Sequence, residues 1–149
     1  MTDPSDIVNW RRLDARVTTS GQPTTTQLAA IADLGIVHVI NLGLHTHPDA
    51  LADERGDVTR LGMNYTHIPV DFAAPTLEDF EEFRTAFEAT WPDKVHIHCI
   101  FNWRVSAFFY RYQRYVLNID DATARAMMDS IWEPEGIWAD FVLRDSRPG

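Results

Sequence analysis

One cysteine and one arginine stand close together between His98 and Ser106, and their types and spacing suit nucleophilic chemistry. Cys99 follows a β-prone run, and four residues separate it from Arg104. Where a strand ends and a helix begins, backbone N–H groups and the helix N-terminus bind anions, phosphate above all. The same field stabilises a thiolate, and an arginine can hold two phosphate oxygens in a fork. The segment therefore predicts a thiolate nucleophile beside a phosphate-binding loop formed by Ile100, Phe101, Asn102, Trp103 and Arg104.

Two neighbours of this loop are expected to assist it. His98 is expected to be a hydrogen-bonded structural residue that supports the loop rather than a base. Ser106 is a candidate for the phosphate-binding set, and two interpretations of it stay open. It is either a residue of the first helical turn or a hydrogen-bond donor to the thiolate.

Two groups of histidines could bind a metal ion. The first group is His67, His96 and His98, and the second is His45 and His47 with Asp49. Buried histidines with hydrogen-bond partners are the favoured interpretation. We therefore predict neither a metal site nor a cofactor.

Strand and helix signals alternate along the chain. Apolar, β-prone runs predict strands at 15–18, 36–42, 63–70 and 94–98. Amphipathic segments predict helices that begin near Thr24, Leu51, Thr76, Arg104, Asp121 and Glu135. The alternation predicts an α/β fold, with a mostly parallel sheet of about four to five strands and helices on both faces. Ligands bind beyond the carboxyl ends of such strands, and Cys99 lies at one of these ends.

Length and composition predict a single domain over residues 1–149, with loose ends at 1–9 and 145–149. The chain is 45% hydrophobic and 23% charged, which is typical of a globular protein. Its net charge of −9 disfavours a nucleic-acid or anionic-membrane partner. A single cysteine forms no internal disulfide and no cysteine-rich zinc site. With no secretory signal or spanning segment in the sequence, a cytoplasmic location is expected.

Three segments of the sequence resemble a known family. They are Thr19-Ser20-Gly21-Gln22-Pro23, Ile68-Pro69-Val70-Asp71-Phe72, and His98-Cys99 with Asn102, Arg104, Val105, Ser106 and Ala107. The chain resembles the cysteine-dependent protein tyrosine and dual-specificity phosphatases. More narrowly, it is similar to the bacterial phosphatase-like family that also occurs as a domain fused to β-lactamase-like hydrolases. The resemblance implies the phosphatase fold over about residues 13 to 145.

The chain departs from the general phosphatase pattern in the loop. That pattern has five residues between cysteine and arginine, whereas this chain has four, and a gap-free match places Val105 where arginine belongs. Asn102 falls where the family often has glycine. Asparagine tolerates a positive φ better than most other residues, so the loop can still turn.

The resemblance also implies a general acid from the loop after the third predicted strand. Asp71 lies 28 residues before Cys99 in that loop and is the candidate. Asp79 and Glu78 are alternatives. Thr76 and Asp79, however, also form the pattern of a helix start, where an acidic residue complements the helix dipole.

These residues predict a phosphoric monoester hydrolase that works through a cysteinyl-phosphate intermediate. The loop has no basic side chain between Cys99 and Arg104, which disfavours multiply phosphorylated inositides. Aromatic neighbours favour an aryl phosphate such as phosphotyrosine, on a protein or on a small molecule. The alternatives are a phosphate- or phosphopeptide-binding pseudophosphatase, a single-cysteine sulfurtransferase or arsenate reductase, and a scaffold with an inert cysteine.

Overall fold

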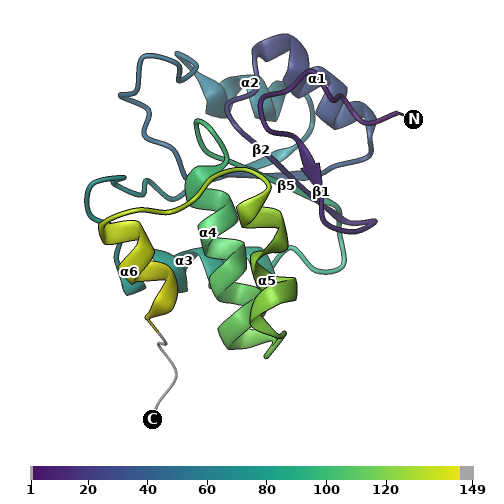
Figure 1. Ribbon diagram of the computed structural model, residues 1–149. Helices are drawn as coiled ribbons and strands as arrows, with labels where there is room; N and C mark the ends of the chain where they lie inside the picture. Colours follow the sequence, from purple (N-terminus) through teal and green to yellow (C-terminus); the bar gives the residue numbers. More distant parts are fainter. Residues whose placement is uncertain (1, 145–149) are drawn as a thin grey trace.

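A five-stranded sheet with the order β1-β2-β5-β3-β4 forms the centre of the protein. The computed structural model describes residues 2–144 (Figure 1). The strands are β1 (Arg11–Arg12), β2 (Val17–Ser20), β3 (His38–Asn41), β4 (Asn64–His67) and β5 (Val95–His98). β1 is antiparallel to β2, and all other neighbours are parallel, with Val39 opposite His96. The predicted mostly parallel sheet is confirmed.

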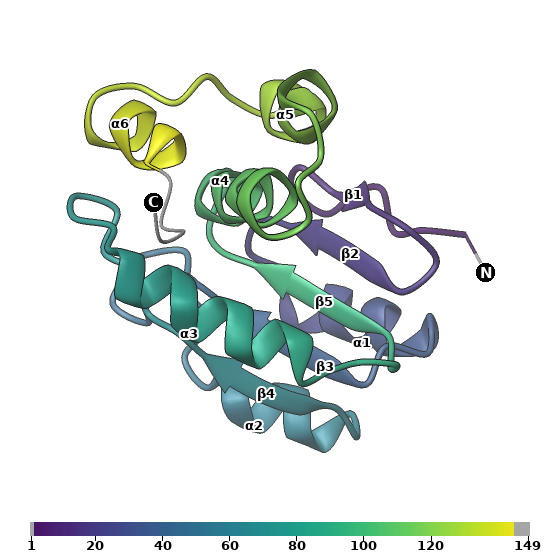
Figure 2. The same cartoon turned by 90° about the horizontal axis from the view of Figure 1, so that it is seen from below.

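Helices cover both faces of this sheet, as predicted. In Figure 2, α1 (Thr25–Asp33) and α2 (Glu54–Arg60) lie on one face. α3 (Leu77–Glu88) and α4 (Trp103–Arg111) lie on the other, where α5 (Asp121–Asp129) and α6 (Ile137–Leu143) pack around α4. A π-helical turn, Tyr112–Val116, extends α4. Within residues 2–144, no helix is both long and apolar enough to span a membrane.

Each face of the sheet has its own hydrophobic core. Val39 of β3 joins the core that includes Leu28 of α1 and Val58 of α2. The next residue, Ile40, joins the core that includes Phe83 of α3 and Phe108 of α4. Successive side chains of a strand point to opposite faces, so a strand covered on both sides buries apolar residues or hydrogen-bonded polar ones throughout. This requirement explains the nearly continuous apolar run that predicts β3.

The helix starts follow the predicted caps. The Thr24 side chain caps α1 together with Gln27, and the Thr76 side chain caps α3 together with Asp79, each in a reciprocal capping box.

The run predicted as a strand over 63–70 forms sheet pairs only at 64–67. Beyond β4, Ile68 still donates a backbone hydrogen bond to Asn41 at the end of β3, and Val70 donates one to Leu42, the next residue. The extended segment therefore reaches the carboxyl edge of the sheet, where Cys99 lies.

The N-terminal segment differs from the sequence expectation. Within the stretch 1–9 predicted to be loose, Ile7 and Asn9 contact the rest of the protein. Ile7 is 2% exposed in the core, and Asn9 forms hydrogen bonds to the loop after Cys99. The next residue, Trp10, stacks on His96 with ring centroids 5.1 Å apart. The predicted loose end at 145–149 lies outside the described residues.

Candidate active site

A small cavity of about 290 Å³ lies at the carboxyl end of β5, directly above Cys99. The residues that line it are His47, Phe72, Cys99, Ile100, Phe101, Trp103 and Arg104. Five of these seven belong to the predicted nucleophile and phosphate-binding set. His47 and Phe72 were not predicted as site residues and come from two other loops.

The backbone carbonyls of the loop after Cys99 are all bound to the surrounding scaffold. The Cys99 carbonyl lies 2.9 Å from Nδ1 of His98, and the Ile100 carbonyl accepts the N–H of Gln22 at 2.9 Å. The Phe101 carbonyl accepts the side-chain amide of Asn9 at 2.8 Å. In a trans peptide the C=O and the following N–H point in opposite directions. The N–H groups of residues 100 to 102 therefore point away from the scaffold.

These N–H groups continue into the first turn of α4. Across the described residues, the backbone N–H groups of 100 to 105 have no hydrogen-bond acceptor in the protein, and the ladder of α4 begins with Ser106 donating to Asn102. Six free N–H groups around a helix N-terminus form a cradle for an anion. We call residues 99–105 the Cys loop.

Asn102 gives the Cys loop its turn. Its φ of 65° lies in the left-handed region, and Asn102 is the N-cap of α4. Its buried side-chain amide donates to the Asn9 carbonyl at 2.9 Å and to Oγ1 of Thr19 at 3.0 Å. A glycine here would permit the same backbone but would lose both hydrogen bonds. Asn102 therefore supports the loop from beneath and does not line the cavity.

Arg104 lies on the first turn of α4 and faces the cavity. Its Nη1 donates to the Val70 carbonyl at 2.9 Å, and its guanidinium lies 5.8 Å from the centre of the Phe72 ring. Arg104 is 6% exposed, and its remaining donors have no protein acceptor among residues 2–144. Because an arginine has five N–H donors, this anchored group can still bind an oxyanion.

Ser106 lies outside the cavity lining. Its hydroxyl donates to the Trp103 carbonyl at 3.0 Å and accepts the indole N–H of Trp132 at 2.9 Å. Of the two interpretations left open, the structure places Ser106 in the first-turn role. The hydroxyl fixes the two tryptophans, whose rings stack 4.9 Å apart.

The three candidate acids, Asp71, Asp79 and Glu78, have different surroundings in the structure. Asp71 is exposed, and its carboxylate accepts the N–H of Ala73 at 2.9 Å, so it does not line the cavity in this structure. Its two neighbours, however, are both at the site, because Val70 holds Arg104 and Phe72 forms part of the wall. Asp79 is committed to the capping box of α3, and Glu78 lines a different groove, between that helix and β4.

A buried chain of hydrogen bonds supports the Cys loop. Nε2 of His98 lies 2.5 Å from Oε2 of Glu54, and Oε1 of Glu54 accepts the side-chain amide of Gln22 at 2.9 Å. The same two residues, His98 and Gln22, hold the carbonyls of Cys99 and Ile100. Glu54 is 2% exposed at the start of α2. We call Gln22, Glu54 and His98 the support triad.

The charges of the support triad follow from its partners. Burial, the largest influence, disfavours ionised Glu54, but attraction to His98 and hydrogen bonds from His98 and Gln22 hold the pKa of Glu54 below its ordinary value. Nδ1 of His98 faces a carbonyl, which only accepts, and Nε2 faces an ionised carboxylate. Both ring nitrogens of His98 therefore lie against oxygen atoms, one on each side of the ring, directly next to Cys99. Burial and then repulsion by His98 keep the pKa of neighbouring His96 well below its ordinary value.

Replacing Glu54 with glutamine is expected to lower the free energy of unfolding by about 2–4 kcal/mol near pH ~7, because it leaves a buried histidine without its ionic partner. The pKa of Glu54 is lower in the folded than in the unfolded chain, so its ionised form stabilises the fold above the ordinary carboxyl range. That stabilisation is lost as the pH falls through the folded-state pKa. Urea unfolding should therefore show the gap between wild type and Glu54→Gln narrowing as the pH falls.

Glu81→Gln is the matched control, since Glu81 is exposed on α3. It should unfold like wild type near neutral pH. A Glu54→Gln variant that unfolds like Glu81→Gln would contradict the role of the support triad.

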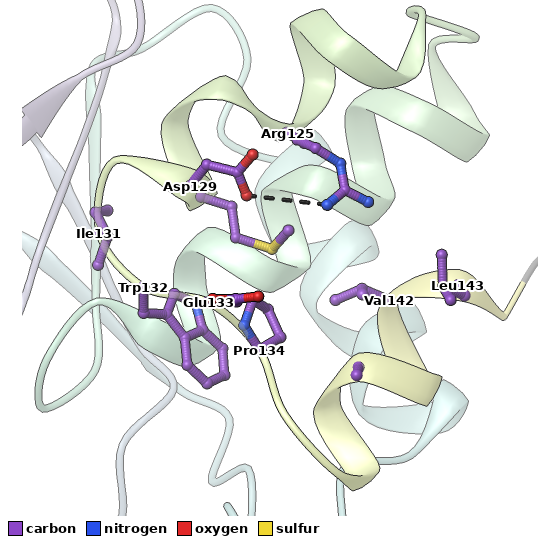
Figure 3. Close-up of a pocket in the computed structure, with 10 residues that line it drawn as sticks. Arg125, Asp129, Ile131, Trp132, Glu133, Pro134, Val142 and Leu143 are labelled. Atoms are coloured by element: carbon purple, nitrogen blue, oxygen red, sulfur yellow. Dashed lines mark ion pairs between the residues drawn. The ribbon is translucent and has the colours of Figure 1, made fainter.

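A larger groove elsewhere contains no such chemistry. It measures about 550 Å³ and lies between α5 and α6, as Figure 3 shows. On its wall Arg125 pairs with Asp129 at 4.0 Å, and Trp132 lies at the opposite end. Among the residues that line it there is neither a cysteine nor a histidine. Chemistry rather than size therefore identifies the cavity above Cys99 as the candidate active site.

Solved structures place this geometry in a family. The chain is 31% identical to a "putative phosphatase (DUF442)" of Shewanella putrefaciens CN-32, with a TM-score of 0.83 over 94% of this chain and 92% of that one. A second DUF442 structure from the same organism is 34% identical, with a TM-score of 0.75 over 83% and 79% of the two chains. This chain belongs to the DUF442 family. No family model and no curated protein matches the sequence.

More distant structures share the fold of this DUF442 chain. TpbA of P. aeruginosa, crystallised with pTyr, is 20% identical, with a TM-score of 0.67 over 87% of this chain and 75% of that one. The core catalytic domain of the PP-IP phosphatase SIW14 from S. cerevisiae is 12% identical, with a TM-score of 0.72 over 94% and 86%. The predicted likeness to cysteine-dependent phosphatases is confirmed.

The segments that carry the resemblance meet around the cavity of this DUF442 protein. In the first, a Cβ on Gly21 would lie 2.4 Å from the Ile100 carbonyl, so only glycine permits the approach that lets Gln22 hold the loop. In the second, Val70 and Phe72 contact Arg104. The third segment is the Cys loop itself. The motif is therefore a set of contacts around one anion-binding loop.

Proposed function

We propose that this DUF442 protein hydrolyses phosphoric monoesters by covalent catalysis at Cys99. The observation that supports the proposal most directly is the arrangement of the Cys loop. Cys99 and Arg104 line one small cavity, and the six backbone N–H groups between and beside them have no acceptor in the described protein. A nucleophile surrounded by oxyanion donors suits phosphoryl transfer, in which charge spreads over three equatorial oxygens.

The reaction has two displacements. In the first, the Cys99 thiolate forms a bond to phosphorus as the bond to the leaving oxygen breaks, and that oxygen takes a proton from Asp71. In the second, water attacks phosphorus and gives a proton to the Asp71 carboxylate, while the S–P bond breaks and releases phosphate. Arg104 and the loop N–H groups bind the equatorial oxygens in both steps.

We assign the proton transfer to Asp71 because the residues before and after it in the chain both contact the site. Val70 and Phe72 place the Asp71 turn beside the cavity, and the exposed carboxylate has to release the Ala73 N–H as it turns toward an incoming ester. Loop closure over substrate is a common way to complete such a site. No metal ion or cofactor enters either step.

An aryl phosphate is the proposed substrate class. Phe72, Phe101 and Trp103 form the rim, with neighbouring ring centroids 5.8–5.9 Å apart. Aromatic walls suit a flat ring, and no lysine and no second arginine lines the cavity for further phosphates. The structure of TpbA with pTyr supports the same class.

Hydrolysis of p-nitrophenyl phosphate with EDTA present tests this function. We expect metal-independent turnover, competitive inhibition by orthovanadate, and a kcat/KM for a phosphotyrosine peptide at least about tenfold above that for the phosphoserine peptide. Turnover that requires a divalent cation would contradict the proposal. Vanadate binding without turnover would instead favour a phosphate-binding pseudophosphatase.

A further inference from the structure

The polar side chains of the active-site cavity are few. Among the residues that line it, polar side-chain groups belong to Cys99, Arg104 and His47, with the indole N–H of Trp103 as a further donor. Cys99, Trp103 and Arg104 belong to the Cys loop. His47 belongs to the loop between β3 and α2, so it faces the cavity from a different part of the chain. It has no part in the reaction proposed above.

The ring of His47 is fixed by its own loop. Nδ1 accepts the backbone N–H of Asp49 at 3.0 Å, and the backbone of His47 bonds to Leu44 and Ala50 on either side. An Nδ1 that accepts a hydrogen bond is unprotonated, so the neutral ring carries its proton on Nε2. Nε2 has no partner in the part of the chain that the structure describes, which leaves one N–H donor on a ring at the cavity wall.

The neighbouring histidine shows the contrast. His45 lies in the same loop, but its Nε2 bonds to the Tyr65 hydroxyl at 2.8 Å, and its ring stacks on His67 with centroids 3.7 Å apart. It does not line the cavity. Of these two histidines, only His47 therefore lines the cavity with a ring nitrogen that has no partner within residues 2–144.

We propose that His47 is a substrate-binding residue whose Nε2–H donates a hydrogen bond to an oxygen of the bound phosphoryl group. This inference rests on the proposed function and adds to it a donor from outside the Cys loop. A neutral imidazole that loses the Nε2 proton becomes an imidazolate, which is far too basic to form near neutral pH. His47 therefore binds substrate, and the proton transfer stays with Asp71.

Two substitutions separate this donor from the structural contact. The side-chain oxygen of His47→Asn can still accept the Asp49 N–H, but the chain is too short to replace Nε2. The longer amide of His47→Gln can place an N–H near the position of Nε2. His45→Gln is the control in the same loop. For each variant, kcat/KM for p-nitrophenyl phosphate and the dissociation constant of orthovanadate are measured, with thermal unfolding as the check of folding.

We expect His47→Asn to lower kcat/KM and to weaken vanadate binding, each by about tenfold or more, as for a lost hydrogen bond to a charged group. His47→Gln should recover most of both losses, and His45→Gln should stay within about twofold of wild type. Unchanged vanadate binding in folded His47→Asn overturns the inference, whatever happens to kcat/KM. Because vanadate binding needs no turnover, this result stands apart from a failure of the proposed hydrolysis.

Discussion

Replacing Cys99 with serine is expected to lower kcat/KM for p-nitrophenyl phosphate by about 10⁴-fold or more, because a serine hydroxyl without a general base is a poor nucleophile. The cradle of N–H groups and Arg104 is unaffected by the change. Cys99→Ser should therefore still bind orthovanadate or phosphate, and titration calorimetry should detect that binding. Loss of turnover with retained anion binding separates the nucleophile from the binding site.

Thermal unfolding is the control that shows whether the Cys99→Ser variant is folded. Serine is nearly the same size as Cys99 but adds a buried hydroxyl, so thermal unfolding should show a folded variant with a modest loss of stability. Equal rates in wild type and Cys99→Ser would exclude Cys99 as the nucleophile. The cavity would then remain an anion-binding site, and another residue would have to be the nucleophile.

Replacing Arg104 with lysine is expected to lower kcat/KM by about 10²-fold or more. Lysine keeps the positive charge but lacks the planar fork that holds two equatorial oxygens, and these contacts strengthen as charge develops in the transition state. The loss should fall mainly on kcat. Steady-state kinetics on the purified variant measure both constants.

Arg125→Lys is the matched control for Arg104→Lys. Arg125 lies on α5, pairs with Asp121 at 3.2 Å, and does not line the active-site cavity. It should keep wild-type kinetics. An Arg104→Lys variant as active as Arg125→Lys would show that Arg104 only anchors Val70.

The sequence was sufficient to predict the fold because local signals and burial agree in most elements. The run that became β3 is mostly apolar because helices cover both faces, and threonines cap α1 and α3 as the pattern indicates. Two elements were placed less well. The predicted strand at 15–18 forms instead at Val17–Ser20, and β1 was missed because two arginines have no apolar pattern.

The cavity that contains the proposed nucleophile was also predictable, because Cys99, the loop and Arg104 are contiguous in the sequence and line it together. The distant parts of the site were not. Glu54 lies in a predicted helix with an ordinary mixture of charges, and only the tertiary packing brings it within 2.5 Å of His98. His47 was considered as a metal ligand, and its place at the cavity wall depends on a loop whose conformation has no periodic signal.

The shortened spacing between cysteine and arginine has a structural explanation. With four residues between them, Arg104 falls on the first turn of α4, and Asn102 makes the turn that glycine makes in the general pattern. Arg104 still faces the cavity that Cys99 lines. The Val105 position, where a gap-free match expects arginine, is buried in the core.

The most direct test of covalent catalysis is to trap the intermediate on the wild-type chain. Turnover of p-nitrophenyl phosphate is stopped with acid after a few milliseconds, and the digested protein is analysed by mass spectrometry. We predict a burst of nitrophenol that matches the enzyme concentration, with the phosphoryl group on the peptide that contains Cys99. A phosphoryl group on any other residue, or a burst without modified Cys99, would contradict the account.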